Sequence, residues 1–206
     1  MRKFSAAAAV LPLFLTLAVV PAQAVQITGK GIMLGLSLSR WSGEDIGRHD
    51  AWMSFALGGF LTFNIIDELS VQPELLFVQK GTKWPDNDLN LNFRLSYLEL
   101  PILAKYSFTV GPGVKVFIFG GPAFAFKVGA TMRFEWQGEL ITDDIKGMKS
   151  LDLGLAFGAG GELPIGVTRL TVGLRYTLGL MNCYEVEGEA LEAKNGALLI
   201  MAGIGF

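Results

Sequence analysis

The sequence has one cysteine and one histidine, and only 17 % of its 206 residues are charged. Cys183 alone cannot form an intrachain disulfide or a cysteine-based metal site. Beyond the N-terminal segment no run of about 18 apolar residues occurs, so no transmembrane helix is expected. Basic and acidic residues number 17 and 19, so the chain lacks the basic surplus typical of nucleic-acid binding, and we expect no nucleic-acid partner.

The N-terminal segment has the pattern of a targeting signal. Two basic residues precede an apolar stretch that ends at Val20, and an A-x-A cleavage motif ends at Ala24. We therefore predict a signal peptide over residues 1–24, a mature chain that starts at Val25, and one domain over 25–206. A transmembrane anchor is the alternative, but the apolar run is short and ends in a cleavage motif.

The chain is rich in glycine, with 26 residues, and in residues that alternate between apolar and small or polar. The clearest example lies between Leu151 and Leu180, where a short break at residues 164–166 divides two such runs. A period of two predicts strands, and the break predicts a hairpin. Because one face is apolar and the other combines glycine with charge, the pattern suits a narrow barrel surrounded by lipid.

The same alternation predicts eight strands. Their approximate ranges are 31–41, 52–65, 69–80, 91–108, 114–129, 151–163, 169–180 and 195–206. Short turns follow every even-numbered strand and long polar loops follow the odd-numbered ones, the longest at 130–149. We therefore predict an all-β, eight-stranded antiparallel transmembrane up-and-down barrel in the bacterial outer membrane, with both termini periplasmic. A soluble lipocalin-like barrel is the rival and would place the leucines inside.

Three strands have irregular patterns. Pro73 cannot donate a ladder hydrogen bond, so we expect a bulge there. Above Tyr97 the polar residues change parity, which indicates a bulge or a strand that projects beyond the membrane. In the fifth strand, Lys115 and Lys127 share the inward parity, so Phe117 and Phe119 are expected to fill the lumen.

Seven charged residues have inward parity. They are Glu74, Glu99, Lys105, Asp152, Glu162, Arg169 and Arg175. One interpretation is a polar channel, and the other is a closed network of ion pairs. Eight strands leave an interior just wide enough for side chains, and buried charges need partners, so both signs together favour the closed structural network.

The candidates for a catalytic or metal site have weaker sequence patterns. His49 shares a loop with Ser42 and Asp50, which invites a Ser-His-Asp reading, but a triad is defined by geometry, and a solvated loop histidine is favoured. Several acidic groups could hold a cation, yet their spacing matches no calcium loop, so solvated charge is favoured. These groups are Asp86 with Asp88, Asp143 with Asp144, and Glu185, Glu187, Glu189 and Glu192. We expect no catalytic residue, metal or cofactor, and an incidental role for Cys183.

Residues 97–106, Tyr-Leu-Glu-Leu-Pro-Ile-Leu-Ala-Lys-Tyr, resemble the Y-L-E-x-P-x-L-x-K-Y signature of the PorT-like outer-membrane β-barrel family. Residues 120–122, 152–163 and 175–180 resemble that family's later strands. The alternation that ends at Phe206 resembles the signal read by the barrel-assembly machinery, although residue 204 is isoleucine where such ends often carry tyrosine.

This resemblance implies an eight-stranded barrel of OmpA- and OmpX-type architecture from a diderm bacterium. Some relatives assist type IX protein secretion, and no catalytic residues come with the resemblance. The expected function is therefore non-enzymatic: binding or scaffolding, or support of envelope assembly or secretion. A narrow small-solute pore and a lipid-modifying enzyme are the alternatives. The expected partners are outer-membrane lipid, the barrel-assembly machinery during insertion, and envelope or secretion-complex proteins.

Overall fold

The protein is described here by a computed structural model. It describes residues 26–43, 50–85, 90–136, 139–145, 147–183 and 193–206. The predicted signal peptide and its cleavage site between Ala24 and Val25 lie outside the described residues. Among the described residues, no helix is long and apolar enough to cross a membrane.

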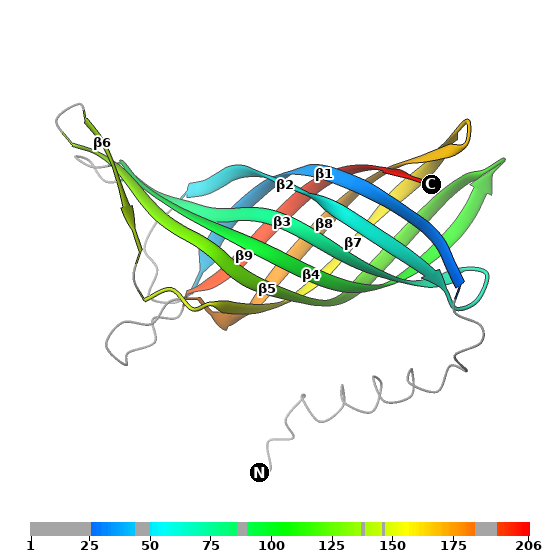
Figure 1. Ribbon diagram of the computed structural model, residues 1–206, viewed down its shortest axis with the longest axis horizontal. Coiled ribbons are helices and arrows are strands. Elements are labelled where there is room, and N and C mark those ends of the chain that lie inside the picture. The colour runs from blue at the N-terminus through cyan, green and yellow to red at the C-terminus, as the bar shows by residue number, and fades with distance from the viewer. Residues whose placement is uncertain (1–25, 44–49, 86–89, 137–138, 146, 184–192) are drawn as a thin grey trace, which may run out of the picture.

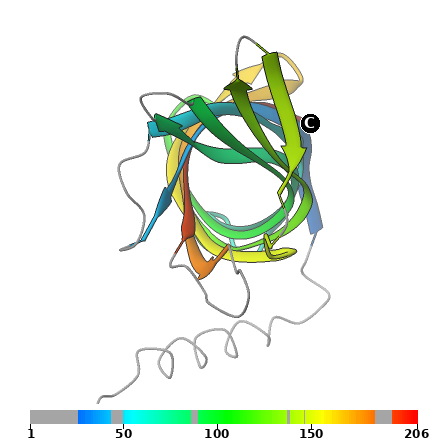
Figure 2. The same ribbon diagram turned by 90° about the vertical axis from the view of Figure 1, so that its left-hand side faces the viewer.

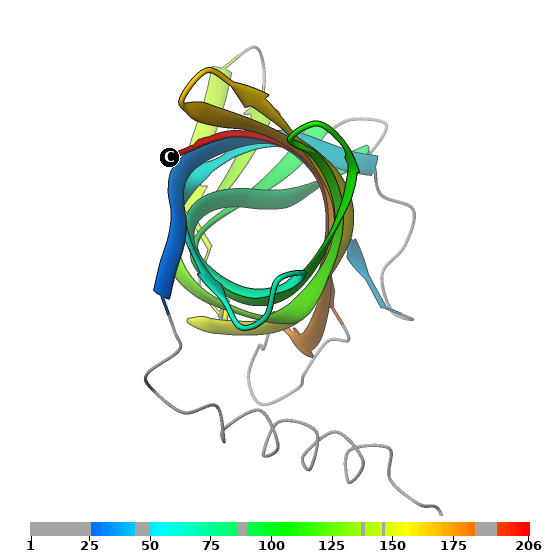
Figure 3. The same cartoon turned by 90° about the vertical axis from the view of Figure 1, so that its right-hand side faces the viewer.

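Eight long strands form a closed antiparallel barrel (Figure 1). They are β1 (Gln26–Ser42), β2 (Asp50–Asn64), β3 (Leu69–Pro85), β4 (Asn90–Gly111), β5 (Val114–Trp136), β7 (Leu151–Ile165), β8 (Thr168–Asn182) and β9 (Lys194–Gly205). Each strand pairs with the next one in this series, and β9 pairs with β1 to close the ring, which is visible from both ends in Figures 2 and 3. The predicted eight-stranded up-and-down barrel is confirmed.

The closing ladder extends to the last residue of the chain. Phe206 donates its backbone N–H to the Lys30 carbonyl at 2.8 Å and accepts a hydrogen bond from the Lys30 N–H at 3.2 Å. From there β1 and β9 pair without interruption up to Ser42 and Lys194. The first and last strands of the barrel are therefore joined along their full common length.

A further strand, β6 (Glu139–Asp144), lies outside the ring, and β5 is its only partner among the described strands. The prediction of a loop over 130–149 is therefore wrong. β5 continues to Trp136, and β6 runs back beside it. The sequence still alternates in this part of β5. However, the outward residues here include Thr131 and Arg133, so the outer face lacks the apolar residues by which a membrane strand is recognised.

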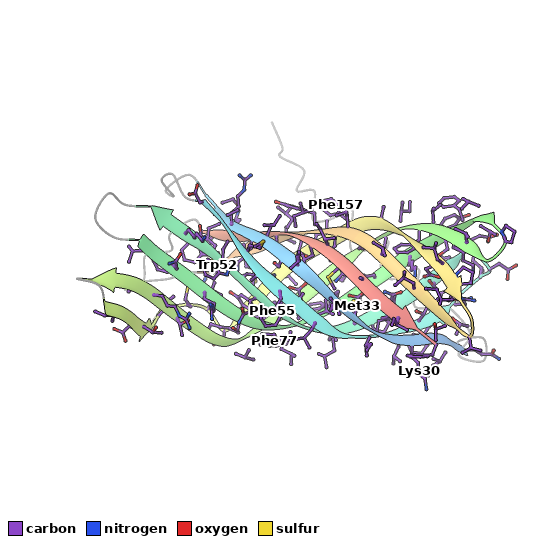
Figure 4. The ribbon with its side chains drawn as sticks, turned by 90° about the horizontal axis from the view of Figure 1, so that it is seen from above. Lys30, Met33, Trp52, Phe55, Phe77 and Phe157 are labelled. Atoms are coloured by element: carbon purple, nitrogen blue, oxygen red, sulfur yellow. The ribbon has the colours of Figure 1, made fainter. Side chains whose placement is uncertain are left out.

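Side-chain burial follows the predicted faces. On β1, Leu34 is 66 % exposed while Ser37 is fully buried, and the other strands show the same contrast. Large apolar residues cover the outside of the barrel, as Phe55, Phe77 and Phe157 do in Figure 4. The lipocalin-like alternative would require the opposite arrangement and is excluded.

Glycines on β7 make room for two aromatic rings in the lumen. A Cβ atom on Gly158 would lie 2.6 Å from Phe119 Cζ, and one on Gly160 would lie 2.5 Å from Phe117 Cζ. Phe117 is buried and Phe119 packs against the interior cluster around Leu103. The inward position of both rings agrees with the sequence prediction, and the glycines explain how they fit.

The irregular strands differ from expectation in two places. No bulge occurs at Pro73, because the β2–β3 register is the same on both sides of it. β4 keeps a single inward parity, so Leu95 and Tyr97 are both buried. The extra residue near Tyr97 is Val128 on β5, where the β4–β5 register shifts. A bulge was foreseen in this region, but its position on the neighbouring strand was not.

We predict that Gly158 cannot be replaced by alanine without loss of stability. The added methyl group would meet both the Phe119 ring and the Leu174 carbonyl of the next strand. Overpacking of this kind costs about 1–3 kcal/mol. Urea unfolding of the barrel from lipid vesicles measures the change.

Gly120→Ala is the matched control, because the nearest atoms to its added carbon lie at an ordinary 3.8 Å. Its unfolding midpoint should stay close to wild type. Equal midpoints for the two variants would contradict the packing argument.

Candidate functional site

Towards the end of the barrel with the short turns, the lumen holds a chain of polar contacts. Arg175 Nη2 lies 2.7 Å from Glu74 Oε2 and donates to Oε1 at 2.8 Å, and both side chains are almost fully buried. Gln72 donates to Glu74 Oε1 at 2.8 Å and accepts from Lys105 Nζ at 3.4 Å. Lys105 also forms an ion pair with Glu162. We call these five residues the turn-end cluster.

A second group, the loop-end cluster, lies on the same inward face towards the long loops. It comprises Lys80, Tyr97, Glu99, Asp152 and Asn195. Lys80 Nζ lies 2.7 Å from Glu99 Oε2, with both side chains buried. The Asn195 amide donates to Asp152 Oδ2 at 2.8 Å and to the Tyr97 hydroxyl at 3.2 Å.

Aromatic faces support the buried cations. Lys105 Nζ lies 4.2 Å from the Phe117 ring centroid, and Arg175 Cζ lies 5.3 Å from that of Phe119. In water-poor surroundings a cation over a ring face gains more than it does at an exposed site. The rings therefore fill the lumen and stabilise its charges at the same time.

Between the two clusters the lumen is filled by apolar side chains. They are Leu76, Val78, Pro101, Leu103, Ala156 and Leu199, all essentially without solvent exposure. A remaining cavity of about 40 Å³ lies beside Arg175 and Met33. No continuous polar path therefore joins the two ends through the described side chains.

The seven predicted inward charges divide into three groups. Glu74, Glu99, Lys105, Asp152 and Arg175 are buried, and the side chain of Glu162 is 12 % exposed. The five buried residues and Glu162 all belong to one of the two clusters.

Arg169 is exposed and belongs to neither cluster. It lines an open vestibule of about 310 Å³ at the turn end, together with Lys115 and Glu162. Because Arg169 lies so close to the β7–β8 turn, its inward parity places it in this water-accessible vestibule.

Four members of the clusters are absent from the predicted set of seven. Lys80 shares the parity of Gln72 and Glu74 on β3 but lies at the predicted end of its strand. Gln72, Tyr97 and Asn195 are uncharged, and the predicted set contains only charged residues. Inward parity of polar residues, charged or not, is the sequence signal that identifies all four.

The structure describes only some of the remaining candidates. His49 and the fourth-loop glutamates lie outside the described residues, as do Asp86 and Asp88. Ser42 ends β1 and Asp50 begins β2. Asp143 lies on β6, and among the described residues no three metal-ligating side chains gather.

Cys183 follows β8 directly and is buried, with its backbone bonded to Ala193 and Lys149. Burial, with a smaller contribution from the Asp152 charge, raises the pKa of the Cys183 thiol to about 12. The reactive thiolate is therefore scarce at neutral pH, which fits an unreactive structural cysteine.

At the loop end, four strands continue past the apolar band as one sheet. The β3–β4 ladder extends to Pro85 and Asn90, and β5 pairs with both β4 and β6 in this region. The outward residues Asn92 and Arg94 are polar here, whereas Leu98 below them is apolar. We call the outer parts of β3, β4 and β5 together with β6 the extended sheet; it projects from the end opposite the C-terminus (Figure 1).

The family model for the outer membrane protein beta-barrel domain matches residues 11–185. The chain belongs to this family. It is therefore a β-barrel protein of the bacterial outer membrane. No curated protein matches the sequence.

Among solved structures, this outer-membrane barrel is similar to Neisserial surface protein A (NspA), with 13 % identity, coverage of 85 % of this chain and 95 % of that one, and a TM-score of 0.51. OprG from Pseudomonas aeruginosa has 11 % identity, coverage of 90 % and 99 %, and a TM-score of 0.48. Ail of Yersinia pestis has 15 % identity, coverage of 88 % and 100 %, and a TM-score of 0.43. At such low identity the likeness to NspA supports the fold alone.

We predict that Arg175→Met strongly destabilises the barrel. The substitution leaves the Glu74 carboxylate buried without its cation, and breaking a buried pair in this way costs about 3–5 kcal/mol. Urea unfolding from lipid vesicles would report the loss as a lower midpoint.

The double variant Glu74→Gln/Arg175→Met removes both charges and should recover part of that loss. Arg169→Gln is the matched control, because Arg169 is exposed and has no role in the turn-end cluster. A double variant no more stable than Arg175→Met would show that the pair is not the source of the effect.

Proposed function

We propose that this outer-membrane barrel is a non-enzymatic binding protein. It binds a partner protein with the extended sheet, on the cell surface. The observation that carries the proposal is β6, which pairs with β5 on one side and with no other described strand. A strand with an unpaired edge offers N–H and C=O groups to another chain, and extended peptides bind proteins by adding a strand there.

The side chains of β6 suit such a role. Ile141 is 38 % exposed, and Thr142 is exposed beside it. The strand also contains acidic residues. Charged residues on an edge strand limit non-specific pairing with other chains, and acidic ones favour a partner strand with basic residues.

The orientation is part of the proposal. Barrels of the outer membrane have short periplasmic turns and longer external loops. The extended sheet lies at the long-loop end and the C-terminus at the other, so we place the sheet outside and both termini in the periplasm. The PorT-like signature over residues 97–106 supports an envelope assembly or secretion complex as the setting.

Cysteine labelling of intact cells tests the orientation. In a Cys183→Ala background, Thr142→Cys should react with a membrane-impermeant maleimide on intact cells. Val167→Cys is the matched control, because Val167 is 98 % exposed in the β7–β8 turn and should react only after the outer membrane is permeabilised. Labelling of Val167→Cys alone on intact cells would invert the assignment.

The same cysteines test partner binding. A photocrosslinker attached at residue 142, followed by purification from native outer membrane in mild detergent, should give one stoichiometric adduct. A crosslinker at the lipid-facing Met53, which is 65 % exposed, should not give it. Recovery of the barrel alone, or the same adduct from both positions, would count against the edge as a binding site.

The narrow-pore alternative conflicts with the packed lumen. Buried apolar side chains fill the lumen between the two clusters, and the cavity beside Arg175 has a volume of about 40 Å³. In planar bilayers we therefore expect the purified barrel to give no stepwise conductance above background. Reproducible single-channel steps that persist after repurification would support the narrow-pore function instead.

A further inference from the structure

Three cations share one outward surface at the base of the extended sheet. They are Lys83 on β3, Arg94 on β4 and Arg133 on β5. Lys83 and Arg133 both pair with Asn92, on opposite sides of β4, and Arg94 is the next outward residue along that strand. Diagonal neighbours of this kind lie about 7–8 Å apart, so the three charged groups can reach one another.

This surface begins where the lipid-facing band ends. Outward residues of the same strands on the membrane side are apolar and exposed, as Leu98, Phe126 and Val128 are. Trp52 marks the same level, with Lys83 Nζ 5.4 Å and Arg94 Cζ 5.6 Å from its ring centroid. Tryptophan is enriched at membrane–water interfaces, and Figure 4 shows Trp52 towards the loop end of the barrel.

The three cations lack the partners that the lumen cations have. Within the described part of the chain none of them forms an ion pair, although Asp50 lies opposite Lys83 in the β2–β3 ladder. The Nε atoms of Arg94 and Arg133 are buried, and no described group accepts a hydrogen bond from them. Like charges placed together destabilise each other, so an anion bound among the three cations would stabilise this surface.

We propose that Lys83, Arg94 and Arg133 bind the phosphate groups of a phosphorylated glycolipid, lipopolysaccharide, in the outer leaflet beside the barrel. Guanidinium groups match phosphate oxygens with two parallel hydrogen bonds, and lysine adds a point charge. The acyl chains of the same lipid would lie against the apolar residues immediately below. The choice of leaflet rests on the orientation given under the proposed function.

The test measures binding of diphosphorylated lipid A to the full mature barrel in detergent by native mass spectrometry. Arg94→Gln/Arg133→Gln should weaken binding by on the order of tenfold, since each cation near an anionic lipid surface contributes a severalfold gain. Dephosphorylated lipid A should bind the double variant and wild type equally. Unchanged affinity of the double variant for the phosphorylated lipid would overturn the proposal.

Lys30→Gln is the matched control, because Lys30 is also outward and exposed but lies at the opposite end of the barrel (Figure 4). Its substitution should leave binding unchanged, and an equal loss would show that the effect is general charge. If the glutamine variant does not fold, Arg94→Lys/Arg133→Lys keeps the charges but loses the paired hydrogen bonds, and it should bind more weakly than wild type. Wild-type affinity of the lysine variant would overturn the proposed contacts.

Inorganic phosphate serves as the competitor that separates a lipid headgroup from a free anion. Millimolar phosphate should not displace the lipid, and complete displacement would assign the site to a free phosphate anion instead. Binding in detergent does not depend on the side of the membrane. A failure here is therefore distinguishable from a failure of the labelling experiment on residues 142 and 167.

Discussion

The structure depends on the confinement of polar side chains to a lumen that has room for little else. Lipid covers the outside, so the apolar residues that would form the core of a soluble protein lie on the surface. Charged groups inside must then find partners among the few side chains facing them. Arg175 with Glu74, and Lys80 with Glu99, meet this requirement, and the glycines of β7 make room for the aromatic rings that lie against Arg175 and Lys105.

The same confinement makes the interior a packed support, and we propose that recognition takes place on the outer surface. Two polar clusters with an apolar layer between them connect β3, β4, β7, β8 and β9 across the lumen. Outside the ring, β6 has β5 as its only neighbour among the described strands, and Arg94 and Arg133 each have a buried Nε with no hydrogen-bond partner among the described residues. We infer that binding to protein and to lipid is divided between neighbouring surfaces of the extended sheet.

Much of the fold could be predicted from the sequence, because lipid and lumen impose opposite chemistry on alternate residues. That rule identified the ring of eight strands, and it gave the inward side of Phe117. The rule did not identify β6, which lies beyond the part of the barrel where alternate residues face lipid and lumen. Beyond the membrane both faces of a strand meet water, so β6 had no apolar signature and was taken as loop.

The individual pairs in the lumen were also beyond sequence analysis. Parity shows which face a residue lies on, but the stagger between strands decides which inward residues meet. Glu99 therefore had no identifiable partner until the register brought Lys80 beside it. Val128 illustrates the same limit, because one extra residue on β5 changes every pairing beyond it.

The hydrogen bonds between Phe206 and Lys30 have a consequence for biogenesis. The ring closes through the first and last strands of the barrel, so the β1–β9 ladder cannot form until β9 has been synthesised. Until then β1 keeps an open edge, which is prone to association with other chains. Pairing with β9 removes this edge, so we expect a barrel that lacks β9 to be more prone to association with other chains.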